Sequence, residues 1–597
     1  MKAPLPTPYS RYFIPRMLTS RLALVAALAV AACQPASRPA RNRAPAVPER
    51  RAAEFPPSWH LTAGAKATFA PRAMVASIAP LASAAGVEIL RRGGNAVDAA
   101  VAVGFALVPT WPAAGNIGGG GYMVIRMADG RTAALDYREV APLAATRDMY
   151  VDSAGKLTDR SIVGHLSVGV PGAVAGMAEA LRKYGTMSLA QVMAPAIRLA
   201  ERGFVVDTGL SQSIGGSSDL IERFEGRRIF LEGGQALAPG TRLVQPELAR
   251  TLRLIAERGP DAFYRGDVAD SLVAEVRRGG GIITKEDLAR YRPVWREPLR
   301  STYRGYTLLA MPPSSSGGVT ITETLNVLET YDTLPPFGSA AYTHLLASAF
   351  QRAFVDRNAK IGDPAFVKVP LDELTSKEYA RRLRATIDPA RATPTTALGG
   401  VASEGANTTH YSVVDGAGNA VSTTTTLNNS FGSGVVVRGG GYFLNDEMDD
   451  FAVRPGKPNM FGLVQGEANA IAPGKRMLSS MSPTIVVDPG GQVLLVVGAA
   501  GGPTIITATA EVILNVLDHG MTLADAMRAP RIHHQALPDY IRYEDGGIAQ
   551  PVLDSLTAMG HALDPVPRIA TANAVMRVKG GYEGVSEPRA RGGAAGY

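Results

Sequence analysis

The hydrophobic and polar positions of this chain alternate, from about residue 70 onward, between the spacing of helices and the spacing of strands. Apolar residues at helical spacing predict a helix over residues 80–92, and Gly93-Gly94 fits the glycine that commonly follows a helix C-terminus. Asn95 is a residue type favoured at an N-cap, so a second helix is expected to extend from it to about Leu107.

A largely helical region is expected over residues 171–330. Within it, Ser188 and Gln191 have the spacing of a capping box, which predicts a helix that ends near Arg202. Helical spacing recurs over residues 251–258, 267–278, 341–359 and 374–387. No internal repeat is evident.

Strand-like segments occur in three pairs, each pair joined by a turn that contains glycine and aspartate. The pairs are residues 122–127 with 133–137, 408–414 with 420–427, and 484–487 with 493–497. An apolar segment over residues 504–517 predicts a buried helix after the last pair. Strands with helices before and after them predict a layered α/β protein.

Composition and charge narrow the class of protein. The chain has 597 residues, of which 46% are hydrophobic, so it is not a disordered protein, and its single cysteine cannot form an internal disulfide. The formal net charge of +8 divides into +4 for residues 1–32, +3 for residues 33–60 and +1 for the remaining body. A nearly neutral body argues against nucleic acid as a partner.

The first 32 residues have the features of a secretory signal. Arg16 and Arg21 precede an apolar run of 11 residues, 22–32, which is shorter than the roughly 20 residues of a membrane-spanning helix. The four residues that end at Cys33 resemble the lipobox of bacterial lipoproteins, so a lipidated Cys33 and a periplasmic, lipid-anchored protein are expected. An ordinary signal peptide with an incidental cysteine is the alternative. Residues 33–67 are expected to form a flexible tether.

Common catalytic and cofactor signatures are absent from the sequence. It contains no G-x-S-x-G elbow, no G-x-x-x-x-G-K-[ST] phosphate loop and no H-E-x-x-H metal motif. The glycine run 118–121 leads into a strand pattern, whereas a phosphate loop leads into a helix. His533 and His534 are adjacent, so their side chains point apart and make poor joint metal ligands. No cofactor or metal is expected.

The segment Asn407-Thr408-Thr409-His410-Tyr411-Ser412-Val413-Val414-Asp415 indicates a specific chemistry. It closely resembles the processing site of the γ-glutamyltransferases, a family also called γ-glutamyl transpeptidases and glutathione hydrolases. The resemblance covers about residues 68–597. Further motifs in the family's order begin at Asp136, Thr426, Glu447, Leu478 and Gly501. Their common order makes the resemblance specific, whereas any one motif alone would be weak.

The resemblance implies a fold and a maturation step. The fold is the αββα sandwich of the N-terminal-nucleophile hydrolases, an α/β architecture built jointly by two subunits from one precursor. Cleavage between Asn407 and Thr408 would give a large subunit of residues 68–407 and a small catalytic subunit of residues 408–597. The two subunits would remain together as a heterodimer.

Cleavage would also provide the base that the nucleophile needs. A threonine hydroxyl is a weak nucleophile, and the α-amine of an N-terminal Thr408, with a pKa of roughly 7.7–8.0 in model peptides, can take its proton. The resemblance implies that Thr426 supports the nucleophile and that the N–H groups of Gly501 and Gly502 form the oxyanion hole. Taken alone, Thr408 and Thr426 would be ordinary strand residues.

A γ-glutamyl substrate carries an α-carboxylate and an α-ammonium, so its pocket needs groups of both charges. By resemblance, the carboxylate ligands are Arg138, Ser479 and Ser480, because a guanidinium can bind a carboxylate bidentately. The groups expected around the ammonium are Asn428, Glu447 and Asp450.

One position departs from the family pattern. Residues 455–462 match a lid over the glutamyl site, and bacterial members often have tyrosine where this chain has Phe461. Phe461 keeps the ring but lacks the hydroxyl that latches the lid, so a looser lid is expected. Near the C-terminus, Ser586 to Arg589 is kept, but the acidic residues that follow in the family are replaced.

The sequence therefore predicts a γ-glutamyltransferase and glutathione hydrolase. It would transfer a γ-glutamyl group from small donors such as glutathione to water, amino acids or peptides, and would touch a membrane only through its lipid anchor. The first alternative is a cephalosporin or glutaryl acylase on the same scaffold, which the intact set of charged pocket residues disfavours. The second is an inactive binding lipoprotein, which the retained Asn407-Thr408 and Gly501-Gly502 disfavour.

Overall fold

The computed structural model describes residues 50–56, 59, 65–398, 408–453, 466–590 and 592–597. Cys33, Asn407 and Phe461 lie outside these residues, so lipidation, the residue before the scissile bond and the altered lid stay predictions. Among the described residues, no helix is both long enough and apolar enough to cross a membrane.

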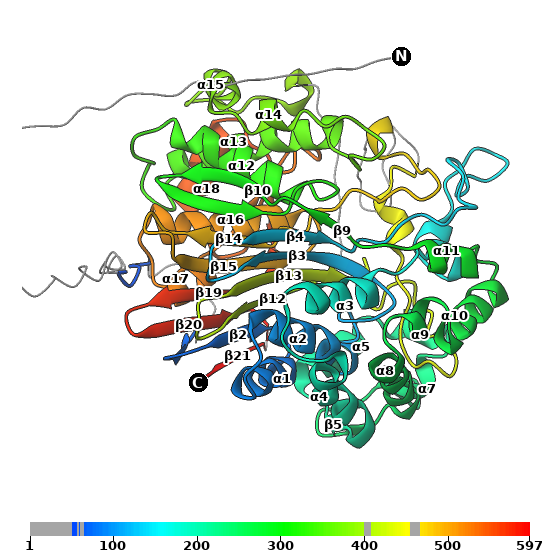
Figure 1. Ribbon diagram of the computed structural model, residues 1–597. Coiled ribbons are helices and arrows are strands. Elements are labelled where there is room, and N and C mark those ends of the chain that lie inside the picture. The colour runs from blue at the N-terminus through cyan, green and yellow to red at the C-terminus, as the bar shows by residue number, and fades with distance from the viewer. Residues whose placement is uncertain (1–49, 57–58, 60–64, 399–407, 454–465, 591) are drawn as a thin grey trace, which may run out of the picture. The chain divides into compact units, whose positions relative to one another are not determined.

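Two seven-stranded sheets form the centre of the fold (Figure 1). One sheet has the order β21 (Gly593–Gly596), β2 (Met74–Ser77), β12 (Thr408–Val414), β13 (Ala420–Thr426), β3 (Gly120–Arg126), β4 (Thr132–Asp136) and β9 (Val294–Arg296). The other has the order β1 (Thr68–Ala70), β20 (Gly581–Ser586), β19 (Thr571–Val578), β15 (Val493–Ala500), β14 (Thr484–Val487), β11 (Tyr306–Ala310) and β10 (Leu299–Tyr303). All strand pairs in both sheets are antiparallel.

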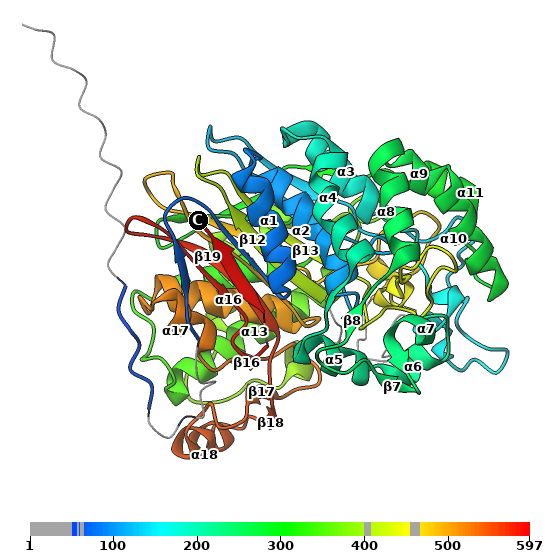
Figure 2. The same cartoon turned by 90° about the horizontal axis from the view of Figure 1, so that it is seen from below.

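Helices cover the outer face of each sheet (Figures 1 and 2). The first sheet packs against α1 (Pro80–Arg91), α2 (Ala96–Thr110) and α3 (Ala173–Tyr184), with α4 (Leu189–Arg202) and α8 (Pro246–Arg258) behind them. The second sheet packs against α12 (Gly317–Glu329) and α16 (Thr504–Leu517), with α13 (Ala340–Lys360) outside them. The predicted αββα sandwich is confirmed.

Local sequence signals fix several of these elements where they were expected. Asn95 caps α2 through its side chain in a capping box with Asp98, and Ser188 caps α4 in a capping box with Gln191. The three predicted hairpins are the pairs β3–β4, β12–β13 and β14–β15, and the predicted buried helix is α16. Short-range patterns of this kind are decided by neighbours in the sequence, which explains their agreement.

Other elements were not anticipated from the pattern. Residues 299–310 lie in the region expected to be mainly helical, yet they form the β10–β11 hairpin at the edge of the second sheet. The C-terminal strands β19, β20 and β21 complete both sheets. Within the range expected to be a tether, Arg51 N–H donates to Gly520 O over 3.0 Å, and Trp59 is buried with its ring centroid 5.9 Å from that of Phe337.

The β12–β13 hairpin occupies the centre of the first sheet, and its two faces differ. Tyr411 and Val413 pack into the apolar core under α1 and α2. His410 and Ser412 point the other way, into the layer between the sheets, where Ser412 Oγ donates to Val496 O over 3.2 Å. Burial lowers the pKa of His410 to about 3, so this imidazole stays neutral. The hairpin is thereby held rigidly between a helix layer and the second sheet.

Candidate active site

Thr408 is the first residue of β12 and lies opposite the last residue of β13, Thr426. The two hydroxyl oxygens are 3.4 Å apart. Thr426 Oγ1 also accepts the backbone N–H of Asn428 over 2.8 Å, so its position is fixed from the chain that follows it. Both threonines are buried, with exposed fractions of 9% and 2%. The structure thus brings the predicted nucleophile and its predicted supporting hydroxyl together.

Gly501 and Gly502 connect the end of β15 to the start of α16. Both have positive φ, 135° and 61°, and a Cβ on Gly501 would lie 2.6 Å from Thr504 Oγ1 and 3.0 Å from Ala570 Cα. Glycine is therefore required at Gly501, and the positive φ of Gly502 favours glycine there too. The backbone N–H groups of both glycines lack a hydrogen-bond acceptor within the described part of the chain, and they precede the N-terminus of a 14-residue helix. Free N–H groups beside a helix N-terminus suit a developing negative charge.

Arg138 lies at the centre of a buried cluster of charges, with a side chain only 1% exposed. Its Nη1 is 2.6 Å from Glu447 Oε2 and 3.5 Å from Glu139 Oε2, and its Nη2 forms an ion pair with Asp450. Glu447 and Asp450 come from one short turn, Glu447–Asp450. The predicted carboxylate ligand Arg138 therefore contacts two of the predicted ammonium ligands.

Ser479 and Ser480 reach the same place from the segment before β14. Ser479 O accepts the backbone N–H of Ser316 over 2.7 Å, which ties this segment to the start of α12. Ser480 Oγ accepts a hydrogen bond of 3.0 Å from Nη2 of Arg357, a residue of α13. Arg357 is 1% exposed and also donates to Ser316 Oγ over 3.2 Å. A second buried guanidinium thus supports the Ser480 hydroxyl, one of the two expected to bind a carboxylate.

Asn428 has a left-handed backbone with φ of 75°, a conformation that asparagine tolerates better than most residues. Its Nδ2 donates to Asp446 O over 3.1 Å. Its Oδ1 is buried and has no hydrogen-bond partner among the residues that the structure describes. A buried amide oxygen of this kind is costly unless a ligand donates to it, as an ammonium group would.

These side chains converge on one small pocket. Its lining consists of Arg138, Thr408, Thr426, Asn428, Asp450, Ser479, Ser480, Met481, Gly502 and Ile505. Glu447 lies behind Arg138, and Gly501 precedes the glycine that lines the pocket. Seven other predicted site residues, some of them far apart in the sequence, therefore meet Thr408 around this pocket. No group of three or more metal-ligating side chains is found among the described residues.

Comparison with known proteins agrees with this site. The model of the family described as gamma-glutamyltranspeptidase matches residues 82–597. The chain belongs to the gamma-glutamyltranspeptidase family. Relatives named glutathione hydrolase proenzyme are 50% identical in Pseudomonas sp. (strain A14), covering 81% of this chain and 85% of that protein, and 47% identical in Escherichia coli (strain K12), covering 87% and 91%.

The gamma-glutamyltranspeptidase fold is shared with acylases. The solved structure of cephalosporin acylase from Bacillus halodurans matches with a TM-score of 0.78 and 29% identity, over 95% of this chain and 99% of that chain. The overall architecture therefore does not distinguish a glutathione hydrolase from an acylase. Only the residues of the pocket can distinguish them.

Sequence reasoning missed Arg357 and Glu139 as members of this gamma-glutamyltranspeptidase site. Arg357 lies in the last turn of α13, where its sequence context does not distinguish it from an exposed helical arginine. Glu139 directly follows Arg138 and is fully buried. A glutamate beside a predicted ligand arginine was the available signal, but only the tertiary structure shows that both side chains enter one cluster.

The supporting role of Thr426 can be tested by Thr426→Val. We expect kcat to fall about 10- to 100-fold with little change in KM, because the hydroxyl that contacts Thr408 Oγ1 and accepts Asn428 N–H is lost. Thr409→Val is the matched control, since the Thr409 hydroxyl is buried without a hydrogen-bond partner in the described chain and points to the opposite face of β12. Equal kcat values for the two variants would contradict the role of Thr426.

A pH dependence of stability is expected from Glu139. Burial, opposed only in part by Arg138, raises the pKa of Glu139 from 4.5 to about 8. The folded protein therefore binds a proton that the unfolded chain releases between about pH 4.5 and 8, so stability falls as pH rises through this window. Glu139→Gln should flatten the fall in thermal unfolding temperature between pH 5 and pH 8. An unchanged pH profile would show that Glu139 is ionised in the folded protein.

Proposed function

We propose that this chain is a glutathione hydrolase and γ-glutamyltransferase with Thr408 as its nucleophile. The observation that carries the proposal is the position of Thr408, at the start of a central strand, opposite Thr426 and beside a pocket that contains both Arg138 and Asp450. Membership of the gamma-glutamyltranspeptidase family and relatives named glutathione hydrolase support it.

The first step is self-cleavage, which the name proenzyme of the relatives supports. The Thr408 hydroxyl attacks the carbonyl carbon of residue 407, the C–N bond of that peptide breaks, and the Thr408 nitrogen leaves as an amine. Water then hydrolyses the resulting ester. The products are a carboxylate at residue 407 and an N-terminal Thr408 whose α-amine can act as a base.

In turnover, the α-amine of Thr408 takes the hydroxyl proton while the oxygen attacks the γ-carbonyl of the substrate. The N–H groups of Gly501 and Gly502 hold the oxyanion of the tetrahedral intermediate. The leaving amine accepts a proton, and a γ-glutamyl ester on Thr408 remains. Water or the amine of an acceptor then attacks this ester and regenerates the hydroxyl.

The ion pair between Arg138 and Asp450 explains how a zwitterion would be recognised. The α-carboxylate of the substrate would pair with Arg138 and the hydroxyls of Ser479 and Ser480, and the α-ammonium would pair with Asp450 and Asn428 Oδ1. Arg138 and Asp450 would each give up the other as a partner and pair with the oppositely charged group of the substrate. Neither charge then remains buried without a counter-charge.

One experiment tests this function against its rivals. Purified protein is run on a denaturing gel and assayed with γ-glutamyl-4-nitroanilide and with a glutaryl amide, which lacks the α-ammonium group. Two bands with turnover of the γ-glutamyl compound alone are expected. Turnover of the glutaryl compound alone would establish an acylase. A single uncut band without activity would rule out both enzymes and favour an inactive binding protein.

We also propose that the protein is exported and lipidated at Cys33 as a periplasmic lipoprotein. The basic and apolar segments before the only cysteine of the chain support this. Cys33→Ser should move the enzyme from the membrane fraction to the soluble periplasmic fraction with unchanged kcat. Equal membrane association of both forms would rule out this anchor.

A further inference from the structure

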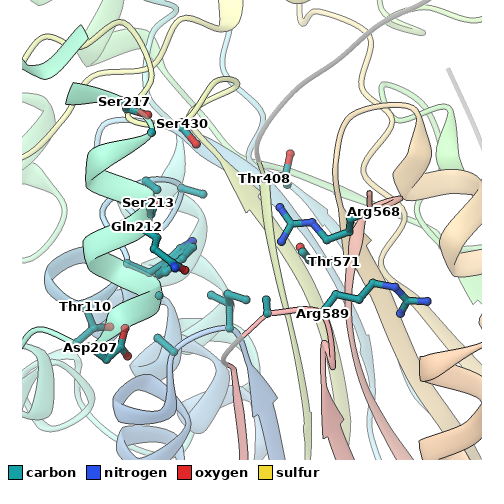
Figure 3. Close-up of a pocket in the computed structure, with 18 residues that line it drawn as sticks. Thr110, Asp207, Gln212, Ser213, Ser217, Thr408, Ser430, Arg568, Thr571 and Arg589 are labelled. Carbon is teal, nitrogen blue, oxygen red and sulfur yellow. The ribbon is translucent and has the colours of Figure 1, made fainter. Parts of the chain in front are cut away.

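Thr408 separates two cavities of different character. One is the small pocket with Arg138 and Asp450, and the other is a larger, open cavity bordered by α5 (Thr208–Gly215), the end of α2 and the segment before β19 (Figure 3). Within the described chain, Thr408 is the one lining residue that the two share. A bond attacked by Thr408 would therefore have its acyl side in the small pocket and its other side in the larger cavity.

The larger cavity contains a cation that has no acidic partner within the part of the chain that the structure describes. Figure 3 shows the side chain of Arg568 directed into the cavity, with its guanidinium between Thr408 and Thr571. Among the described residues, Arg568 has no hydrogen bond or ion pair to its side chain. The other arginine of the lining, Arg589, points away and pairs with Glu544 over 2.6 Å and Glu587 over 2.9 Å.

The remaining walls do not neutralise Arg568. Asp207 is the acidic residue among the described lining residues, and its carboxylate caps α5 by accepting the N–H of Leu210 over 2.8 Å. Trp111 and Thr571 add an apolar ring and a hydroxyl. Among its described residues, the cavity thus offers one positive charge, that of Arg568, without a carboxylate partner close to the predicted nucleophile.

The backbone fixes the position of this charge relative to the reacting atoms. Thr571 begins β19 and pairs with Ala500, the residue before Gly501. Ala570 packs so closely on Gly501 that its Cα would be 3.0 Å from a Cβ at that glycine. Arg568 is two residues before Ala570, so the segment that carries it lies against the predicted oxyanion hole.

We infer that Arg568 selects γ-glutamyl donors and acceptors whose non-glutamyl part carries a carboxylate, such as the cysteinylglycine portion of glutathione or a free peptide acceptor. This inference rests on the proposed function. The leaving amine and the incoming acceptor occupy the same side of the acyl-enzyme, so one guanidinium can bind the carboxylate of either by a charge-assisted hydrogen bond. Donors without this carboxylate, such as anilides, gain nothing from Arg568.

The test compares Arg568→Gln, Arg568→Lys and the wild-type enzyme on glutathione, on glutathione esterified at its glycine carboxylate, and on γ-glutamyl-4-nitroanilide. Arg568→Gln should lower kcat/KM for glutathione about fivefold, mainly through KM, and leave the ester and the anilide unchanged. Arg568→Lys should lower kcat/KM for glutathione less than Arg568→Gln does, because lysine keeps the positive charge. Raising the salt concentration should increase KM for glutathione in the wild type more than in Arg568→Gln.

Arg72→Gln is the matched control, because Arg72 is exposed and lies outside both cavities. It should leave all three kcat/KM values unchanged. A glutathione-to-anilide ratio of kcat/KM that is the same in Arg568→Gln and wild type would overturn the inference and leave the proposed function intact. A processed wild-type enzyme that turns over neither γ-glutamyl compound would instead overturn the proposed function.

Discussion

Thr408→Ala should remain a single uncut chain and should hydrolyse γ-glutamyl-4-nitroanilide at least about 10³-fold more slowly than wild type. The substitution removes the hydroxyl that both self-cleavage and turnover require. The other hydroxyls that line the small pocket belong to Thr426, Ser479 and Ser480, and none of these residues follows residue 407, so cleavage of that bond would give none of them an α-amine. The measurement is a denaturing gel followed over time, together with the initial rate of 4-nitroaniline release.

Thr408→Ser is the control for this prediction, because serine keeps a hydroxyl at the same position. It should cleave itself and retain activity, at a reduced rate, since serine lacks the methyl group that restricts χ1 of threonine. Cleavage of Thr408→Ala at the same peptide bond would show that a different group performs the processing step.

Arg138→Met should lower the free energy of unfolding by about 3–5 kcal/mol. Glu447 and Asp450 are the closest partners of this one guanidinium, so its removal leaves two buried carboxyl groups without their shared cation. Chemical denaturation followed by fluorescence measures the change.

Arg138→Lys should preserve more stability but raise KM for γ-glutamyl-4-nitroanilide about tenfold, because an ammonium cannot form the bidentate pair.

Arg131→Met is the control that tests whether the loss of stability depends on burial of the ion pair. Arg131 pairs with Asp129 over 2.8 Å, but the two side chains are 62% and 53% exposed, so the loss should be at most about 1 kcal/mol. A similar loss of stability for Arg138→Met and Arg131→Met would mean that the buried carboxyl groups are already neutral without Arg138.

The sequence predicted the hairpin that carries the site because its signals are local. Alternation over β12, the aspartate- and glycine-containing turn and the threonine-rich run over β13 predict both strands. In the structure, the register of this hairpin places Thr408 opposite Thr426. The glycine pair at 501–502 was likewise visible, since a strand, two glycines and a buried helix follow one another in the chain.

The sequence also predicts which charged residues bind the substrate, because they match the family's motifs. It does not predict that these residues contact one another. Arg138, Glu447 and Asp450 were expected on opposite ends of a bound zwitterion, whereas the structure pairs them with one another. This pairing depends on the turn Glu447–Asp450 meeting the end of β4, more than 300 residues earlier in the chain. No local pattern encodes such an approach.

By itself, the sequence determined the layered class of the fold and the family, and it predicted the nucleophile, because these rest on short motifs and on hydrophobic periodicity. Only the tertiary structure decided that Arg357 supports Ser480, that Glu139 enters the charge cluster, and that Arg568 faces an open cavity while Arg589 is neutralised. Each of these depends on segments that are distant in sequence and brought together by burial of the two sheets. Burial sets how strongly a charged group interacts with its neighbours and how far its pKa shifts. Sequence spacing alone does not specify that burial.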